Sequence, residues 1–338
     1  LGVSFELDLW GRLRRASESA RADLLAQDEA RRTVVLSLVA SVASGYVTLR
    51  ALDQQLATTR ATAASRAEST RLARRRFEVG LTSELDARQA ESEYEAAQAL
   101  IPQYEAQIAQ QENDLSLLVG RNPGPILRGR TLAGLRRPQV PSGLPSDLLE
   151  RRPDVRVAEQ QLIAANARIG VAKADYFPRL TLTGSYGGES QALSDLFTGP
   201  ANTWSLAAGL VQPLFTGGRI AANVEGAEAR STQADIAYRR TVQTAFRETL
   251  DALVAHRTAG DRLRAREERE SALAQSLKLA NRRYEAGYSS WLDVLDAERN
   301  LFQARLDRVE ARRARLAAAV GVIEALGGGW SQPVPTDG

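Results

Sequence analysis

The chain has 338 residues, of which 43% are hydrophobic and 25% are charged, and its formal net charge is +3. This balance excludes a disordered chain and an ordinary inner-membrane protein, and the length suggests two domains. The charges are spread along helical segments, which indicates solvated helix faces rather than a nucleic-acid interface. Because the sequence has no cysteine, disulfides, thiol catalysis and cysteine metal sites are excluded as well.

The start of the sequence and its most apolar stretch set two further expectations. The sequence begins at Leu1 without a methionine or a signal peptide, so we expect a processed or truncated start. The most apolar stretch, residues 34–47, is interrupted by serines and Gly45 and is shorter than the roughly 20 residues of a membrane helix. Any membrane crossing is therefore expected to be made by strands.

The first predicted elements are a strand and two helices. Residues 3–9 alternate apolar and polar side chains, which predicts a strand with one apolar face. Residues 12–78 contain no proline and predict a single helix of roughly 100 Å. A second helix is expected to begin near Ser83 after a tight turn, and Pro102 is expected to bend it.

Two further strands are predicted later in the chain. Residues 179–186 and 204–210 alternate in the same way, and residues 187–203 between them have the Gly, Ser, Asp and Asn content of an exposed loop. These strands cannot close a barrel alone, so a membrane location would require oligomerisation. A small soluble sheet that caps a helical stalk remains the alternative. Aromatic residues lie near the strand ends, where an aromatic belt would be expected: Trp10, Tyr176, Phe177 and Trp204.

An internal repeat organises the sequence. At an offset of 207 residues, 76–80 (RFEVG) aligns without a gap with 283–287 (RYEAG), and the similarity extends through the neighbouring helices. The repeat predicts a second helical pair over about 219–285 and 290–326. A segment before the second unit, about 145–207, has no counterpart ahead of Leu1, so we expect an equivalent N-terminal piece to be missing.

Apolar residues in the shorter helices recur every seven positions, which predicts antiparallel coiled-coil hairpins. Taken alone, this pattern is equally typical of a plain coiled-coil protein. The residues are Tyr94, Ile101, Ile108 and Leu115 in the first repeat, and Leu295, Phe302, Val309, Leu316 and Ile323 in the second repeat.

Enzyme chemistry has little support in the sequence. His256 is the sole histidine and is expected to be incidental on a helix surface. A Ser/His/Asp hydrolase and a zinc site are therefore poorly supported. Neither a P-loop nor a dinucleotide-binding fingerprint is present.

Residues 148–159, with the sequence LLERRPDVRVAE, resemble the signature of TolC-like outer membrane factors, in the NodT-type branch of efflux lipoproteins. Further matching motifs are ELDLWG at 6–11, YFP at 176–178, QPLFTGGR at 212–219 and ALGGGW at 325–330. Together these motifs cover nearly the whole chain. The signature residues are Leu148, Leu149, Arg151, Arg152, Pro153, Asp154, Val155, Ala158 and Glu159.

The resemblance implies a mainly α fold with a small β part. Long antiparallel coiled-coil hairpins would form a trimeric α-helical periplasmic barrel, continuous with a twelve-stranded transmembrane β-barrel to which each protomer gives four strands. The missing N-terminal part would hold the first strand, the signal peptide and a lipid-modified cysteine, and no other cofactor is expected. The protein would lie in the outer membrane of a Gram-negative bacterium and extend into the periplasm.

The resemblance and the repeat together divide the chain into seven parts. The expected parts are a transmembrane strand (1–11), helical hairpin 1 (12–119, tip 79–83), an equatorial segment (120–145), a tunnel helix (146–175), two transmembrane strands (176–217), helical hairpin 2 (218–326, tip 286–290) and a C-terminal equatorial tail (327–338).

The resemblance implies that the periplasmic end is closed by inward-leaning coiled coils of the second repeat. Asp293 and Asp296 are i, i+3 neighbours on one helix, and in a trimer each would give a ring of three carboxylates that favours cations and could bind a divalent ion. Without the resemblance, these two residues would be ordinary solvent-facing or helix-starting charges. The positions matched to the gate are Tyr284, Leu292, Asp293, Asp296 and Arg299, with Asp86 as the first-unit equivalent of Asp293.

The two hairpin turns resemble the tips that meet a periplasmic adaptor. Gly80 and Gly287 suit the left-handed conformation that ends a helix, and Ser83 and Ser290 are suited to cap the next helix. Capping alone is a complete structural explanation of these turns, and adaptor contact would be an additional role. The tip residues are Val79, Gly80, Leu81, Thr82, Ser83, Gly287, Tyr288, Ser289 and Ser290.

The implied function is that of a passive duct in a tripartite efflux pump with multidrug resistance as a typical role. Its partners would be two further copies of itself, a periplasmic adaptor (membrane fusion protein), an inner-membrane transporter of the RND type and outer-membrane lipid, with no nucleic acid. A periplasmic adaptor and a structural coiled-coil scaffold are the rival interpretations.

Overall fold

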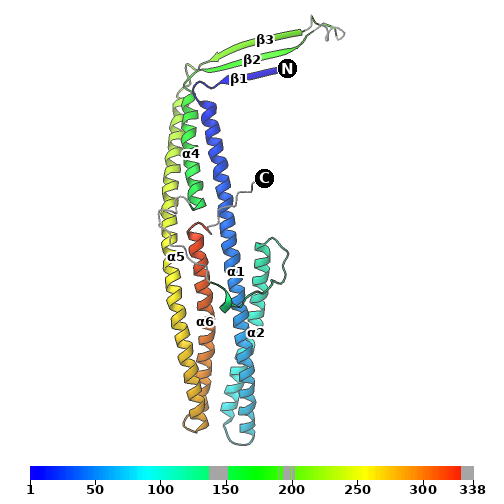
Figure 1. The fold of residues 1–338 in the computed structure, drawn as a ribbon, viewed down its shortest axis with the longest axis vertical. Coiled ribbons are helices and arrows are strands. Elements are labelled where there is room, and N and C mark those ends of the chain that lie inside the picture. Colours follow the sequence, from blue (N-terminus) through cyan, green and yellow to red (C-terminus); the bar gives the residue numbers. More distant parts are fainter. Residues whose placement is uncertain (137–150, 190, 193–198, 200–201, 329–338) are drawn as a thin grey trace. The chain divides into compact units, whose positions relative to one another are not determined.

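The computed structural model describes residues 1–136, 151–189, 191–192, 199 and 202–328. The chain divides into two compact units, one formed by Leu1–Thr33 and Ser146–Ala245 and the other by Val34–Pro145 and Phe246–Gly338. Two long helices contribute residues to both units (Figure 1).

The first unit contains a three-stranded antiparallel sheet in the order β1-β2-β3. Its strands are β1 (Gly2–Leu7), β2 (Arg179–Gly188) and β3 (Asn202–Val211). At 10 residues, β2 and β3 have the length of a tilted transmembrane strand, which needs about 9 to 11 residues.

Two strand boundaries differ from the sequence prediction. The first strand ends at Leu7 rather than Leu9, because the backbone turns there and the Leu9 N–H donates to the Leu7 carbonyl. The predicted loop 187–203 is too long, because its two ends are paired in the sheet. Glycine and polar residues extend the ladder there, since pairing uses the backbone rather than apolar side chains.

The long helices reproduce the internal repeat. Helix α1 (Arg12–Glu78) and α5 (Arg219–Glu285) each have 67 residues, and α2 (Glu84–Leu118) and α6 (Trp291–Ala325) each have 35. Each helix of the second pair begins and ends 207 residues after its counterpart. Helix α2 continues through Pro102.

In the first unit, α4 (Pro153–Ala174) lies between the long helices (Figure 1). Ion pairs of 2.6 Å and 3.1 Å join Arg168 and Arg156 of α4 to Asp23 and Glu29 of α1. The predicted helix 146–175 is interrupted, because Arg151 is helical, Arg152 is not, and α4 begins at Pro153 in its first turn; residues 146–150 lie outside the described residues. Buried alanines on α4 let the neighbouring backbones approach closely.

The second unit is held by the heptad positions. Leu295, Phe302, Val309 and Leu316 of α6 and Leu115 of α2 are buried, which confirms the coiled-coil faces. The other predicted heptad residues, Tyr94, Ile101, Ile108 and Ile323, are half-buried.

The segment that follows α2 packs against the helices of this unit. Its short 3₁₀ helix, η1 (Leu132–Gly134), inserts Leu132 into a core with Val47, Ala51, Val309 and Leu316. Arg128 forms an ion pair with Glu112, and the Ile126 N–H donates to the same carboxylate. Burial opposes ionisation of Glu112, but these contacts outweigh it and lower its pKa. Residues 137–145 and 329–338 of the expected equatorial segments lie outside the described residues.

Helix α1 contains an 18-residue stretch with a mean hydropathy of 1.6, so it is long and apolar enough to cross a membrane by length and composition alone. By mean hydropathy, the expectation that no stretch is long and apolar enough for a membrane helix is therefore wrong. The signal is weak, because core helices share it. In the apolar region of this helix, Gly45 lies against Leu115 of α2 and the Tyr46 hydroxyl accepts a hydrogen bond from the Gly129 N–H.

We predict that Leu49→Ala lowers the stability of the folded protein by about 2 to 5 kcal/mol, because Leu49 is fully buried and its truncation leaves a cavity. Thermal unfolding in detergent measures the change. Leu127→Ala, at a side chain that is 94% exposed, is the matched control and should change stability by less than about 0.5 kcal/mol. Equal losses in both variants would contradict this packing.

Candidate functional site

The sheet of the first unit has one largely apolar face. Residues directly opposite each other on neighbouring strands point to the same side, and the register aligns Phe5 with Leu182 and Leu182 with Ala208. Leu7, Leu180 and Leu210 form a second such row. Six large side chains of this face are exposed in the single chain: Val3, Phe5, Tyr186, Trp204, Leu206 and Leu210.

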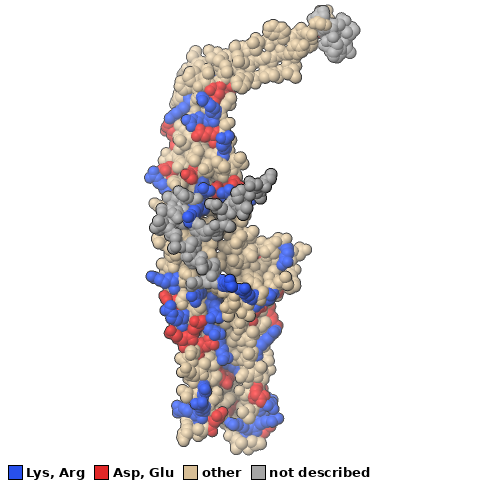
Figure 2. All heavy atoms as spheres, in the orientation of Figure 1, with Lys and Arg blue, Asp and Glu red and all other residues tan. Residues whose placement is uncertain are grey.

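The opposite face of the sheet is polar. Ser4, Thr183 and Ala207 share one row, and the Ser185 and Ser205 hydroxyls hydrogen-bond across the strands at 2.8 Å. In Figure 2 the described strands carry almost no charged atoms, whereas the helical parts carry many. An apolar outer face with a polar inner face is the pattern of a membrane β-barrel wall.

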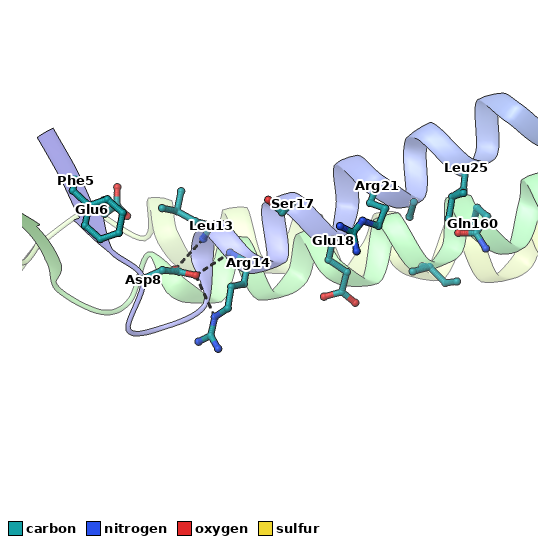
Figure 3. Close-up of a pocket in the computed structure, with 12 residues that line it drawn as sticks. Phe5, Glu6, Asp8, Leu13, Arg14, Ser17, Glu18, Arg21, Leu25 and Gln160 are labelled. Carbon is teal, nitrogen blue, oxygen red and sulfur yellow. Dashed lines mark hydrogen bonds and ion pairs between the residues drawn. The ribbon is translucent and has the colours of Figure 1, made fainter. Parts of the chain in front are cut away.

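Aromatic and charged residues gather where the strands meet the helices. The rings of Trp10 and Phe177 stack at 4.6 Å, and the Trp10 indole N–H donates to the Pro178 carbonyl. Asp8 accepts hydrogen bonds from the Leu13 and Arg14 backbone N–H groups and so caps α1 (Figure 3). This is a polar, helix-starting role that a strand residue would not have.

A groove of about 530 Å³ lies beside this cap (Figure 3). It is lined by apolar residues such as Leu13 and Leu25 of α1 and Ile163 of α4, with Arg14 and Glu18 among its charged residues. Its lining thus combines apolar side chains with the charged groups that start α1.

The signature residues begin α4 and fix it to its surroundings. Arg152 is buried and pairs with Asp154 at 2.6 Å, and Pro153 occupies the first turn. Val155 and Ala158 are buried, Arg151 and Glu159 are exposed, and Leu148 and Leu149 lie outside the described residues. The described part of the signature thus starts and packs a helix.

The two hairpin tips have the same construction. Gly80 and Gly287 adopt positive φ angles of 72° and 79° and end the long helices. Ser83 and Ser290 each close a capping box with the carboxylate three residues later, Asp86 or Asp293. The predicted capping is confirmed. Large apolar side chains remain exposed beside these turns: Val79, Leu81 and Leu85 at one tip, and Tyr288 and Leu292 at the other.

Asp86 accepts more hydrogen bonds than the capping box alone provides. It accepts hydrogen bonds from the Thr82 hydroxyl at 2.7 Å and the Ser83 hydroxyl at 2.9 Å. The bond from Thr82 is the largest cause of its lowered pKa, which burial opposes and Ser83 supports. This carboxylate therefore stabilises the first tip at neutral pH and loses that effect as the pH falls through its lowered pKa.

Two of the predicted gate residues bind the other hairpin of the same chain. Arg76 donates to the Tyr284 hydroxyl at 2.8 Å and also lies over the Tyr284 ring. Arg299 of α6 pairs with Glu93 of α2 at 3.2 Å. Tyr284 also packs against Trp291, with ring centroids 5.1 Å apart. The contacts of Arg76 and Arg299 join hairpin to hairpin near the tips, whereas the Tyr284–Trp291 contact lies within hairpin 2.

The remaining gate positions face solvent in the single chain. Leu292, Asp293 and Asp296 are exposed, and Asp296 accepts a hydrogen bond from Asn300 on its own helix. Asp293 completes the capping box described above, so a structural role accounts for it. Among the described residues, no group of three or more His, Cys, Asp or Glu side chains could hold a metal ion. His256 lies half-buried on α5.

The sequence patterns did not predict a buried cluster of charged residues. Arg66 of α1 is only 4% exposed, pairs with Glu93 at 3.1 Å and lies over the ring of Phe302. Glu298 of α6 belongs to the same cluster, because Arg66 and Glu93 both influence its pKa. A charged residue in an arginine-rich helix resembles any solvated charge, whereas in the structure Arg66 lies with Thr59 and Ala63 on the buried stripe of α1.

The chain matches the family described as "Outer membrane efflux protein" over residues 1–121 and 144–328. The chain belongs to this family. A relative named "Solvent efflux pump outer membrane protein SrpC", from Pseudomonas putida, is 40% identical over 332 residues, which cover 98% of this chain and 71% of the relative. Membership of the family locates this outer membrane efflux protein in the outer membrane, as part of an efflux pump.

Solved structures of outer-membrane channels have a similar fold. A structure of CusC matches with a TM-score of 0.90 and 34% identity, covering 97% of this chain and 77% of that one. The open state of the Neisseria gonorrhoeae MtrE outer membrane channel matches with a TM-score of 0.88 and 33% identity, covering 96% and 74%. This outer membrane efflux protein therefore has the channel fold of a helical periplasmic barrel and a β-barrel.

We predict that Ser83→Ala and Ser290→Ala each destabilise the first turn of α2 or α6 by about 1 kcal/mol, because each removes the hydroxyl of a capping box. Hydrogen exchange of the tip amides measures this as roughly fivefold faster local opening. Ser92→Ala, at an exposed serine inside α2, should leave the tips unchanged. Unchanged exchange in both cap variants would refute the assignment.

Proposed function

We propose that this protein is a passive duct, in which three copies close a β-barrel in the outer membrane and a helical tunnel beneath it, and that it performs no chemistry. The apolar sheet face carries the proposal. A three-stranded sheet with that face in lipid leaves unpaired backbone at both edges, and each unpaired group costs several kcal/mol there. Strands from other copies would remove the cost.

The partners in this proposal follow from an efflux pump's architecture. An inner-membrane transporter, of the RND type, would supply the energy, and a periplasmic adaptor would join it to the exposed apolar side chains at the tips, such as Leu81 and Tyr288. Apolar residues on otherwise charged helix ends suit a protein contact. A lipid-modified N-terminus is part of the same proposal.

The gate is proposed to lie at the tips of the second hairpin. Exposed Leu292, Asp293 and Asp296 would line the narrow end of the tunnel, where three copies would form rings of carboxylates that attract cations. Arg76–Tyr284 and Glu93–Arg299 would hold the closed position, and an iris-like movement that breaks them would open the duct. That the related MtrE channel has an open state supports a movable gate.

The rival interpretations account for less of the molecule. A coiled-coil scaffold explains both hairpins but leaves the apolar sheet face without a partner. A periplasmic adaptor does not explain the duplicated hairpins or the family match.

We predict that Asp293→Ala combined with Asp296→Ala reduces the cation preference of the channel, because the double change removes two negative charges from each copy at the constriction. Single-channel recording of the full-length protein in a planar bilayer measures conductance and reversal potential. The matched control is Asp114→Ala with Asp261→Ala, two exposed acids away from the tips. If the double variant keeps the conductance and cation preference of the native protein, the gate lies elsewhere.

A further inference from the structure

The buried cluster introduced above joins helices of both hairpins. Arg66 donates to the backbone carbonyl of Glu93 at 2.7 Å and pairs with its carboxylate, and Phe302 of α6 covers the guanidinium. Glu93 also takes the ion pair from Arg299. One carboxylate thus serves two arginines, one from hairpin 1 and one from hairpin 2.

Glu298 lacks comparable partners. Its Oε2 atom is buried and has no hydrogen-bond partner among the described residues, and the same holds for the Arg66 Nε atom. Burial raises the pKa of Glu298, Arg66 opposes this shift, and the nearby Glu93 adds to it. Glu298 is half-buried, and an oxygen that is buried without a partner is costly when the carboxylate is ionised, so this group favours its neutral form more than a surface glutamate does.

The charges around Glu298 come from three helices. Arg66 faces it from α1 and Glu93 from α2, while Arg299 follows it on α6 itself. On α5, the other helix of hairpin 2, residues 273–280 carry Lys278 as their one charged residue, and that side chain is exposed. The environment of Glu298 is therefore set by Arg66 and Glu93.

The repeat shows that the cluster is not a by-product of the duplicated packing. At the offset of 207 residues, Arg66 corresponds to Leu273 and Glu93 to Asn300. The equivalent place in the other half therefore has neither the buried cation nor its carboxylate partner. The cluster belongs to one kind of hairpin junction only.

We propose that Arg66, Glu93 and Glu298 form a proton-sensitive latch that sets how tightly the two hairpins pair near their tips. With a proton on Glu298, the two arginines and Glu93 stay paired and α6 stays in place. When Glu298 loses its proton, the new buried charge is relieved by water, which requires α6 to move away from α1 and α2.

The direction of the pH effect follows from the raised pKa. The stabilisation of the closed junction is complete below the ordinary glutamate value of 4.5 and is lost as the pH rises through the raised pKa of Glu298. Asp86 has the opposite sign, since its pKa is lowered and its cap is lost in acid. Loosening on the alkaline side is therefore specific to Glu298. The connection between this loosening and duct opening rests on the proposed gate.

Paired spin labels test the latch directly. The 338-residue sequence contains no cysteine, so Ser92→Cys on α2 and Gln303→Cys on α6 introduce two labelling sites at exposed positions, and the full-length protein labelled without them gives the background signal. Labelled chains are diluted into unlabelled ones, so that the distance within one chain dominates. We expect a narrow distance distribution at about pH 4.5 and a broader, longer one at about pH 8.

Glu298→Gln keeps the shape of the side chain and fixes it neutral, so the distribution should stay narrow at both pH values. Glu95→Gln, at an exposed glutamate of α2, is the matched control and should respond like the native protein. A native distance that does not change with pH, or a Glu298→Gln variant that still responds, would overturn the latch.

Conductance recorded over the same pH range separates the latch from the gate. A distance that responds to pH, together with a conductance that does not, would support the latch and contradict the proposed gate. Loss of both responses in Glu298→Gln alone would support the two together.

Discussion

The sheet imposes the constraint on which the rest of the molecule depends. Its three strands place nearly all of their large apolar side chains on one face, with Val211 as the exception, and within the described residues β1 and β3 each have an unpaired edge. In water the apolar face is unfavourable by about 25 cal/mol per Å², whereas in lipid the open edges are unfavourable. Lipid removes the first cost and strands that close the sheet into a barrel remove the second, so the sheet requires a membrane and additional strands at once.

The helices are stabilised differently, because the cores of these long hairpins contain few large apolar side chains. Alanines dominate the buried positions of α4, and side chains such as Leu49 and Val322 provide isolated points of tight packing. Elsewhere, ion pairs and hydrogen bonds such as Arg76 with Tyr284 join one hairpin to the other. Polar junctions of this kind add little net stability, so two packings of the hairpins can lie close in free energy. That property would suit the movable gate proposed above.

Local patterns made much of the fold predictable, whereas contacts between distant residues did not. The repeat and the absence of proline gave the helix bounds, and glycine and serine at the tips gave the caps, because these features depend on neighbouring residues. The end of β1 was missed, since Asp8 continues the alternation but caps α1. Arg66 was missed because its burial depends on Glu93 and Phe302, which lie on two other helices.

The position of the sheet in the membrane can be measured most directly by spin labels placed one at a time along β3 in the full-length protein in lipid vesicles. We expect collisions with oxygen, which dissolves in lipid, to peak at every second residue, including Leu206 and Leu210. Collisions with a water-soluble nickel chelate should peak at the residues between them, such as Ala207. The same accessibility to both reagents all along the strand, with no period of two, would contradict the membrane wall.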